Sequence, residues 1–264
     1  MLLLLSPAKK LDYDSPVRTR LHTQPLFVEQ AQELISILAR KSASEIASLM
    51  KLSDALATLN VERYRAWSPE FDLRNSRQAI LAFNGDVYEG LEASSLSDKQ
   101  LKWAQDHVAI LSGLYGVLRP LDLMQPYRLE MGTRLGNDRG SNLYAFWGTA
   151  ISDYINQHMA TLNGKKPVDQ HVVLHLASEE YFKAIDRKAL KARVVQCVFQ
   201  EFRNGAWKVI SFNAKRARGL MTRYVIENQL TQPQDLQGFN SAGYAYAPEE
   251  STPDKLFFRR DSAQ

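Results

Sequence analysis

A run of basic residues near the C-terminal end of the chain could bind a polyanion. Positions 202 to 226 hold six Lys or Arg residues and no Asp or Glu, although the net charge of the whole chain is only +4. At about 100° per residue of a helix, apolar side chains occupy one side and basic ones the other. Gly219 falls on the basic side, where a phosphate backbone could approach closely. The basic side consists of Lys215, Arg216, Arg218 and Arg223.

That basic side has a simpler interpretation, because charged outer faces of helices are common and many of them contact only solvent. A second cluster of cations strengthens the case for a polyanion. Arg119 and Arg128 stand among tyrosines in the stretch 113–132, which glycines and prolines interrupt throughout. Arginines beside aromatic rings suit phosphate binding and base stacking. The alternative is that ion pairs with Asp122 and Glu130 hold this loop together.

Polar residues also follow two apolar runs that predict strands. Ser6 and Lys9 come after the first run, and Lys183 comes shortly after the run that ends at Ala177. Sites gather where parallel strands end. A lysine desolvated beside other cations can act as a Schiff-base nucleophile. The sequence assigns no catalytic residue, and Lys9, Lys183 and Glu130 are the candidates.

Residues 46–57 resemble a helix-hairpin-helix motif in the register of their apolar positions. That motif presents backbone N–H groups to a DNA phosphate, and glycines in its hairpin let the phosphate approach. Lys51 and Ser53 stand at the glycine positions here. An ordinary pair of antiparallel helices is the alternative. We predict a helix-hairpin-helix-like element near 42–60, with Lys51 as a DNA contact.

Motifs for other chemistry are missing from the sequence. It has no His-Glu-x-x-His or Cys-x-x-Cys zinc pattern, no Walker or Rossmann glycine pattern, and no Gly-x-Ser-x-Gly elbow. We therefore expect no bound metal and no cofactor. The single cysteine, Cys197, lies in an apolar run that is typical of a buried strand.

The elements that must position these residues alternate between strands and helices. Short apolar runs predict strands, and Asn204-Gly205 predicts a β-hairpin near 194–212. Helical spacing and serine caps predict helices. The expected strands are 2–5, 79–83 and 171–177, and the expected helices are 25–40, from Ser42, from Ser97 through Leu111, 143–162 and 213–230.

The bulk composition fits one globular unit. The chain has 264 residues, of which 45% are hydrophobic, and no linker or repeat divides it. We predict a single compact domain over 1–264 of mixed α/β (α+β) structure, with a mixed β-sheet core flanked by helices. No apolar stretch reaches the ~20 residues of a membrane span. We expect a cytoplasmic monomer that does not associate with membranes.

Several longer motifs, in order along nearly the whole chain, resemble the YaaA family of peroxide-stress proteins. They are Ser6-Pro7-Ala8-Lys9, Gly85-Asp86-Val87-Tyr88, the loop 111–132, Tyr144-x-Phe146-Trp147, Leu176-Ala177-Ser178-x-Glu180-Tyr181-x-Lys183 and Lys215-x-x-Arg218-Gly219-x-Met221-x-Arg223. The resemblance implies a cytoplasmic protein of the hydrogen peroxide response that keeps unincorporated iron low and limits damage to DNA.

The resemblance also implies binding of double-stranded DNA in a positively charged cleft beside a helix-hairpin-helix-like element. Family members often have an uncharged residue at the position of Lys10, which is therefore not a candidate. Matched motif by motif, the residues expected to line the cleft are Lys9, Arg119, Arg128, Lys183, Lys215, Arg218 and Arg223. Lys51 and Arg216 complete the predicted DNA contacts.

Three functions remain open from the sequence. The first is binding of DNA without catalysis and with little sequence specificity. The second is an enzyme that acts on nucleic acid or a nucleotide in the same cleft, for example a lysine-dependent lyase on damaged DNA. This function would use Ser6, Lys9, Tyr115, Glu130, Glu180 and Lys183. The third is a protein-binding module of the stress response.

Overall fold

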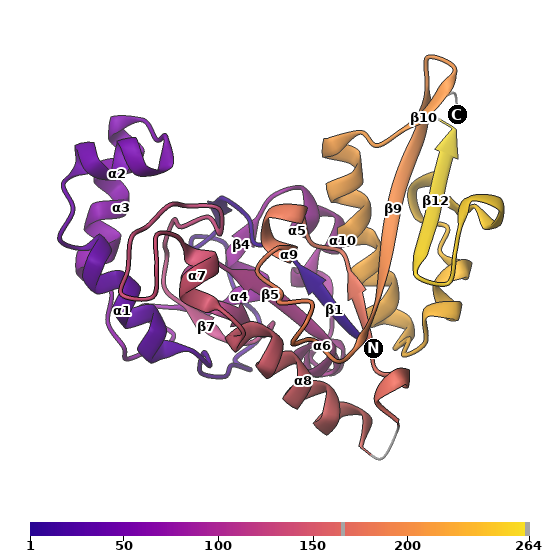
Figure 1. Cartoon of the computed structure of the whole chain (residues 1–264), viewed down its shortest axis with the longest axis horizontal. Coiled ribbons are helices and arrows are strands. Elements are labelled where there is room, and N and C mark those ends of the chain that lie inside the picture. The colour runs from indigo at the N-terminus through magenta and orange to yellow at the C-terminus, as the bar shows by residue number, and fades with distance from the viewer. Residues whose placement is uncertain (165–166, 262–264) are drawn as a thin grey trace.

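An eight-stranded, mostly parallel sheet forms the centre of the protein in a computed structural model that describes residues 1–164 and 167–261 (Figure 1). The strand order is β11-β12-β9-β8-β1-β5-β6, and β10 pairs with β9. Neighbours from β12 to β5 are parallel, and the pairs with β6, β10 and β11 are antiparallel. The strands of this sheet are β1 (Leu2–Leu5), β5 (Val108–Ser112), β6 (Gly116–Leu118), β8 (Val172–His175), β9 (Arg193–Arg203), β10 (Ala206–Lys208), β11 (Ala245–Tyr246) and β12 (Lys255–Asp261).

The first strand is the centre of the hydrophobic core, as its unbroken apolar run predicts. Leu2–Leu5 are at most 1% exposed, because β1 lies between β5 and β8. In this register Leu4 faces Ala109 on one side and His175 on the other. A strand with covered neighbours and covered faces needs apolar residues at every position.

Helices surround this sheet, and two pairs of short strands lie outside it. α10 runs alongside β9 and packs most extensively against α5, and α6 contacts β1 and β5. The helices are α1 (Val28–Leu38), α2 (Ala43–Met50), α3 (Asp54–Ala66), α4 (Ala79–Ala82), α5 (Asp86–Leu91), α6 (Asp98–His107), α7 (Leu143–Trp147), α8 (Ala150–Asn163), α9 (Glu179–Phe182) and α10 (Ser211–Asn228). The short strands are β2 (Lys10–Leu11) with β4 (Phe83–Asn84), and β3 (Arg77–Gln78) with β7 (Leu123–Met124). Short 3₁₀ helices lie at Ala93–Ser95, Val168–Gln170, Pro233–Gly238, Ser241–Gly243 and Pro248–Glu250.

Three predicted elements differ from the structure. The helix capped by Ser97 ends at His107, and its expected last turn is the strand β5. The expected helix 143–162 is two helices, because Gly148 has a positive φ of 47° between them. The expected strand 79–83 is a single helical turn, α4, followed by β4. Short apolar runs are buried either as strand or as helix, and spacing alone does not separate the two.

The hairpin of β9 and β10 turns at Asn204 and Gly205, which both have positive φ, as a two-residue hairpin turn requires. The hairpin ends before position 212, because β10 ends at Lys208 and α10 begins at Ser211. Cys197 is buried in β9, and burial raises the pKa of its thiol.

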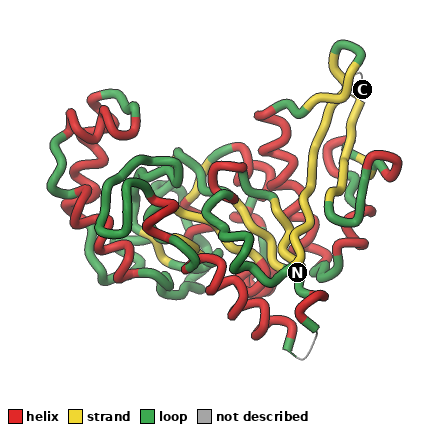
Figure 2. The backbone as a smooth tube through the Cα atoms, in the orientation of Figure 1, coloured by secondary structure: helices red, strands yellow, loops and turns green. Residues whose placement is uncertain are grey.

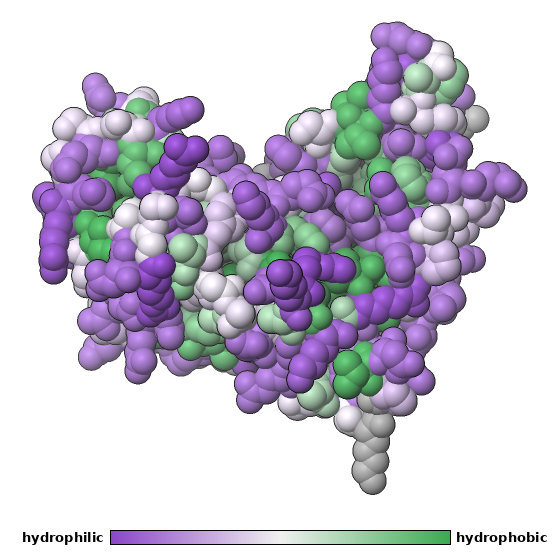
Figure 3. All heavy atoms as spheres, viewed as in Figure 1, coloured by the Kyte–Doolittle hydropathy of each residue, from purple (hydrophilic) through white to green (hydrophobic). Residues whose placement is uncertain are grey.

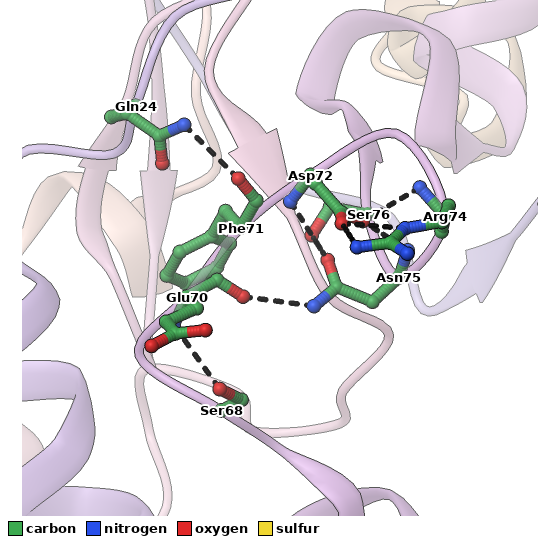
Figure 4. A network of polar contacts seen from close by, with 8 residues as sticks. All are labelled: Gln24, Ser68, Glu70, Phe71, Asp72, Arg74, Asn75 and Ser76. Atoms are coloured by element: carbon green, nitrogen blue, oxygen red, sulfur yellow. Dashed lines mark hydrogen bonds and ion pairs between the residues drawn. The ribbon is translucent and has the colours of Figure 1, made fainter.

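The loop between α3 and β3 is held by its own polar side chains (Figure 4). Asp72 Oδ1 accepts hydrogen bonds from the backbone N–H groups of Arg74 at 2.8 Å and Asn75 at 3.1 Å. The Gln24 side chain donates to the carbonyl of Phe71 at 3.1 Å. These bonds fix the chain where the α2–α3 hairpin joins the rest of the domain.

Two arms extend from the domain, and its surface is hollowed between them (Figure 3). One arm is the α2–α3 hairpin, and the other is the β9–β10 hairpin with the start of α10 (Figures 1 and 2). β4, α5 and α9 lie between the arms, at the floor of the hollow. In the described part of the chain, no helix has the length and apolar character needed to cross a membrane.

Candidate functional site

A pocket of about 470 Å³ lies at the carboxyl ends of β1 and β8. Its walls come from segments far apart in sequence, namely 6–10, 84–88, 127–130 and 178–181, with two residues of α10. In the sheet, β5 pairs with one edge of β1, and β8, which comes later in the chain, pairs with the other edge. Such a reversal of strand order opens a crevice at which ligands bind in α/β sheets.

Two serines bridge this crevice. The Ser6 hydroxyl accepts a hydrogen bond from the backbone N–H of Ser178 at 2.8 Å and donates to the Ser178 hydroxyl at 3.2 Å. Tyr88 of α5 donates its hydroxyl to the carbonyl of Ser6 at 2.9 Å. The segments after both strands are therefore tied to each other and to α5. Ser6 and the start of the segment that leads to Lys183 therefore meet at this edge of the sheet, whereas Lys183 itself lies outside the pocket.

Glu130 lies in the pocket wall between two cations. Its Oε1 is 3.3 Å from Lys9 Nζ and accepts hydrogen bonds from Arg128 at 3.0 and 2.9 Å. Burial would raise the pKa of this carboxyl, but the Arg128 guanidinium and Lys9 outweigh burial and hold the pKa below its usual value. The carboxylate is ionised at neutral pH, yet Oε2 is buried and has no hydrogen-bond partner among the residues that the structure describes.

α10 contributes Lys215 and Arg218 to the pocket. Lys215 Nζ lies 4.0 Å from a carboxylate oxygen of Asp86, and about half of the lysine side chain is exposed. Arg218 is partly buried, which lowers the pKa of its guanidinium. Its Nε is buried and has no hydrogen-bond partner in the described part of the chain. Hence both Glu130 and Arg218 present unpaired polar atoms.

Gly219 does not serve the predicted approach of a phosphate. It is buried where α10 crosses α5, and a Cβ atom there would lie 1.8 Å from the carbonyl oxygen of Val87. The basic side predicted for this helix is interrupted, because α10 packs against α5 at Gly219. Thr222, one turn further along the same side, is fully buried. This close crossing places α10 beside the pocket.

The loop that carries Arg128 and Glu130 is held from several sides. Tyr64 of α3 donates its hydroxyl to the carbonyl of Arg128. The Tyr127 hydroxyl lies 2.6 Å from that of Ser112, at the end of β5. This arrangement joins the base of the α2–α3 arm directly to the pocket wall.

Two predicted DNA contacts are used inside the fold. Arg119 forms an ion pair at 2.7 Å with Asp122, a carboxylate with no solvent exposure, so the alternative of an internal pair describes this arginine. Arg223 donates to the carbonyl groups of Leu91 and Glu92, at the end of α5. Neither arginine lines the pocket.

The three other predicted contacts are exposed and lie outside the pocket lining. Lys183 follows α9, and its Nζ is 5.0 Å from the centre of the Tyr144 ring. Arg216 lies on α10 beside Lys215. Lys51 ends α2 in a left-handed conformation with a φ of 53°. The pocket therefore brings together Lys9, Arg128, Lys215 and Arg218 of the predicted set, with Glu130.

The predicted element near 42–60 is a pair of antiparallel helices, α2 and α3, joined by a short turn. Ser42 and Ser53 cap the two helices. The backbone N–H groups of Lys51 and Leu52 both donate to the carbonyl of Ala47. Two N–H groups of this turn are thus already bonded within the protein, and a phosphate would have to use others.

Sequence reasoning missed the partners that shape the pocket. Asp86 pairs with Lys215, and Tyr88 holds the segment after β1. Both residues follow the turn at Gly85. They belong to the motif Gly85-Asp86-Val87-Tyr88, for which the sequence alone predicts no function. A polar group directly after a buried segment was the available signal.

A second hollow, of about 590 Å³, lies near the loop of Figure 4. Two of its arginines are paired, Arg74 with Asp72 at 2.5 Å and Arg77 with Asp12 at 3.3 Å. Within the described ranges, no group of three or more His, Cys, Asp or Glu residues is placed to hold a metal ion.

The chain is similar to known proteins over its whole length. A family model described as peroxide stress protein YaaA matches residues 1–250. A UPF0246 protein of Bordetella pertussis is 65% identical over 263 residues, which cover both chains completely. UPF0246 proteins of Bordetella petrii (65% over 260 residues, 98% of this chain and 99% of the relative) and a Polaromonas species (60% over 263 residues, all of both chains) are also similar. The chain therefore belongs to the YaaA family of peroxide stress proteins.

Proposed function

We propose that this protein acts in the peroxide stress response by binding double-stranded DNA in the hollow between its two arms. The observation that carries the proposal is that cations from distant parts of the chain lie together at the floor of the hollow. Lys9, Arg128 and Lys215 come from three distant segments and line one pocket together. Five cationic and three acidic side chains line this pocket, so the local balance is positive.

Exposed cations on both arms support a binding surface wider than the pocket. Lys51 lies in the turn of the α2–α3 arm, and Lys208 lies in the β9–β10 arm. Such cations neutralise phosphates without reading base sequence, so we propose binding with little sequence specificity. We further propose that the protein acts in the cytoplasm, limits DNA damage and helps to keep unincorporated iron low.

Fluorescence anisotropy of a labelled duplex, measured against salt concentration, tests the proposal. The variant Lys9→Ala, Lys215→Ala removes two cations whose side chains are 70% and 53% exposed. Each lost phosphate contact reduces the salt slope by about 1, so we expect weaker binding and a slope shallower by about 2. The matched control is Lys99→Ala, Lys102→Ala on α6, which removes the same charge from exposed positions outside the pocket. A parent protein that does not bind at low salt would refute DNA binding.

A further inference from the structure

The pocket at the floor of the hollow has a composition that simple phosphate binding does not need. Its exposed lysines lie at the rim, but the walls also hold three tyrosines, Tyr88, Tyr127 and Tyr181, all buried. Its volume of about 470 Å³ lies within the range of small-molecule sites, about 300–1,000 Å³. A duplex cannot enter such a space, whereas a single nucleotide can.

The acidic wall residue gives this pocket a chemical preference. Glu130 Oε1 already accepts a hydrogen bond from Arg128 and lies beside Lys9, but no described residue donates a hydrogen bond to Oε2. A buried, charged oxygen without a donor is costly, and it selects ligands that bring an N–H or O–H group. The last torsion of a glutamate side chain is soft, so a small rotation can turn this oxygen to a ligand.

The cationic residues supply the complementary half of the site. Arg218 Nε is a buried donor for which the described residues provide no acceptor, and Lys215 is half exposed with its Nζ 4.0 Å from Asp86. Arginine and lysine both bind phosphate. The pocket thus combines aromatic rings, an acceptor for an N–H group, and donors for an anion.

We propose that this pocket binds a single nucleotide, with its base among the tyrosines, an exocyclic amine donating to Glu130, and its phosphate on Lys215 and Arg218. The nucleotide is either free in solution or an unpaired nucleotide of a DNA strand; the second source rests on the DNA binding proposed above, and the first does not. A carboxylate accepts from the amine of cytosine and has no donor for the carbonyl of uracil.

Two ligand pairs that differ at this one group test the proposal. The first pair is dCMP and dUMP, whose dissociation constants are measured by titration calorimetry. The second pair is a duplex with one unpaired cytosine and the same duplex with one unpaired uracil, measured by anisotropy. We expect the cytosine ligand to bind about tenfold more tightly in at least one pair, since a hydrogen bond to a charged group contributes about 1.5–3 kcal/mol.

The variant Glu130→Gln connects this preference to the pocket. An amide can turn its NH₂ group toward the uracil carbonyl, so we expect the variant to lose or reverse the preference. The matched control Glu33→Gln removes a carboxylate of an ion pair on α1, outside the pocket, and retains the preference. Thermal unfolding of each variant verifies that it is folded.

The pattern of results identifies the source of the nucleotide. Discrimination only between the mononucleotides indicates a free nucleotide, and discrimination only between the duplexes indicates a nucleotide of the strand. Equal affinities within both pairs, or a preference that survives in Glu130→Gln, overturn the proposal. Salt-sensitive duplex binding without discrimination leaves DNA binding standing and removes only the nucleotide site.

Discussion

Gly90 of α5 and Gly219 of α10 bring the backbones of these helices into direct contact. A Cβ on Gly219 would lie 1.8 Å from the carbonyl oxygen of Val87, and a Cβ on Gly90 would lie 2.2 Å from that of Arg216. The crossing holds α10 in the position at which Lys215 and Arg218 line the pocket, together with Asp86 of α5. Packing in the core and composition of the site thus depend on the same two glycines.

Replacing Gly219 by alanine should therefore destabilise the protein. Alanine gains about 1 kcal/mol in helix propensity, but the added methyl group forces the two helices apart, and overpacking typically costs about 1–3 kcal/mol or more. We expect a net loss of about 1–2 kcal/mol in the free energy of unfolding, measured with urea. Gly136→Ala is the control, because no atom lies within 4 Å of its Cβ position. Equal stability of the parent and Gly219→Ala would contradict this view of the crossing.

Arg119 should matter for stability and not for DNA. Its partner Asp122 is completely buried and also accepts from the Thr23 hydroxyl at 2.6 Å. Removing one partner of a buried ion pair costs about 3–5 kcal/mol, because the other charge stays unpaired. We expect Arg119→Ala to lose this much stability, by urea unfolding, and to bind duplex DNA with parental affinity while folded.

Arg74→Ala is the matched control for that experiment. Arg74 pairs with Asp72 at the surface, where its side chain is 92% exposed, and such surface pairs contribute little to stability because water and salt screen the charges. If Arg119→Ala unfolded no more easily than Arg74→Ala, the buried pair would not have the structural role described above.

Some residues that line the pocket could be predicted from the sequence, whereas several of the elements around them could not. Ser6 and Lys9 follow the first apolar run and both line the pocket, since positions after parallel strands converge at one edge of a sheet. β5 was assigned to a helix because its apolar residues continue the helical spacing of α6. Only pairing with β1 makes them a strand, and that pairing is not visible in the local sequence.

The ion-pair partners of the basic residues could not be predicted from the local sequence either. Lys215 meets Asp86 only because α10 crosses α5, although α5 ends at Leu91 and α10 begins only at Ser211. Arg119 and Arg128 each had two interpretations, phosphate binding or an internal pair. The structure gives both arginines internal pairs, and only Arg128 also lines the pocket.

His175 should make the stability depend on pH. Its ring stacks on Phe182 at 3.8 Å, and burial lowers the pKa of its imidazole to about 4, although Glu179 opposes the shift. The unfolded chain takes up a proton near pH 6.5 and the folded chain does not. The stabilisation is therefore complete above pH 6.5 and is lost as the pH falls toward 4, by about 2–3 kcal/mol at pH 4.5.

Urea unfolding between pH 7.5 and 4.5 measures this dependence. The variant His175→Phe keeps an aromatic ring beside Phe182 and cannot titrate, so its stability should fall less over this range. His22→Phe, at an exposed position, should retain the parental slope. Identical slopes for His175→Phe and the parent would show that His175 becomes protonated without unfolding.

Neither lysine considered for catalysis should form a Schiff base with damaged DNA. A lysine nucleophile of this kind needs surroundings that exclude water and place other cations beside it. Lys9 is 70% exposed and lies 3.3 Å from the carboxylate of Glu130, so water and an anion stabilise its charge. Lys183 is exposed and lies over the Tyr144 ring. We expect borohydride treatment of the protein with an abasic-site duplex to trap no covalent adduct, under conditions in which an abasic-site lyase is trapped. An adduct that disappears in Lys9→Ala or Lys183→Ala would instead establish a lyase, and the pocket would then have to exclude water when DNA binds.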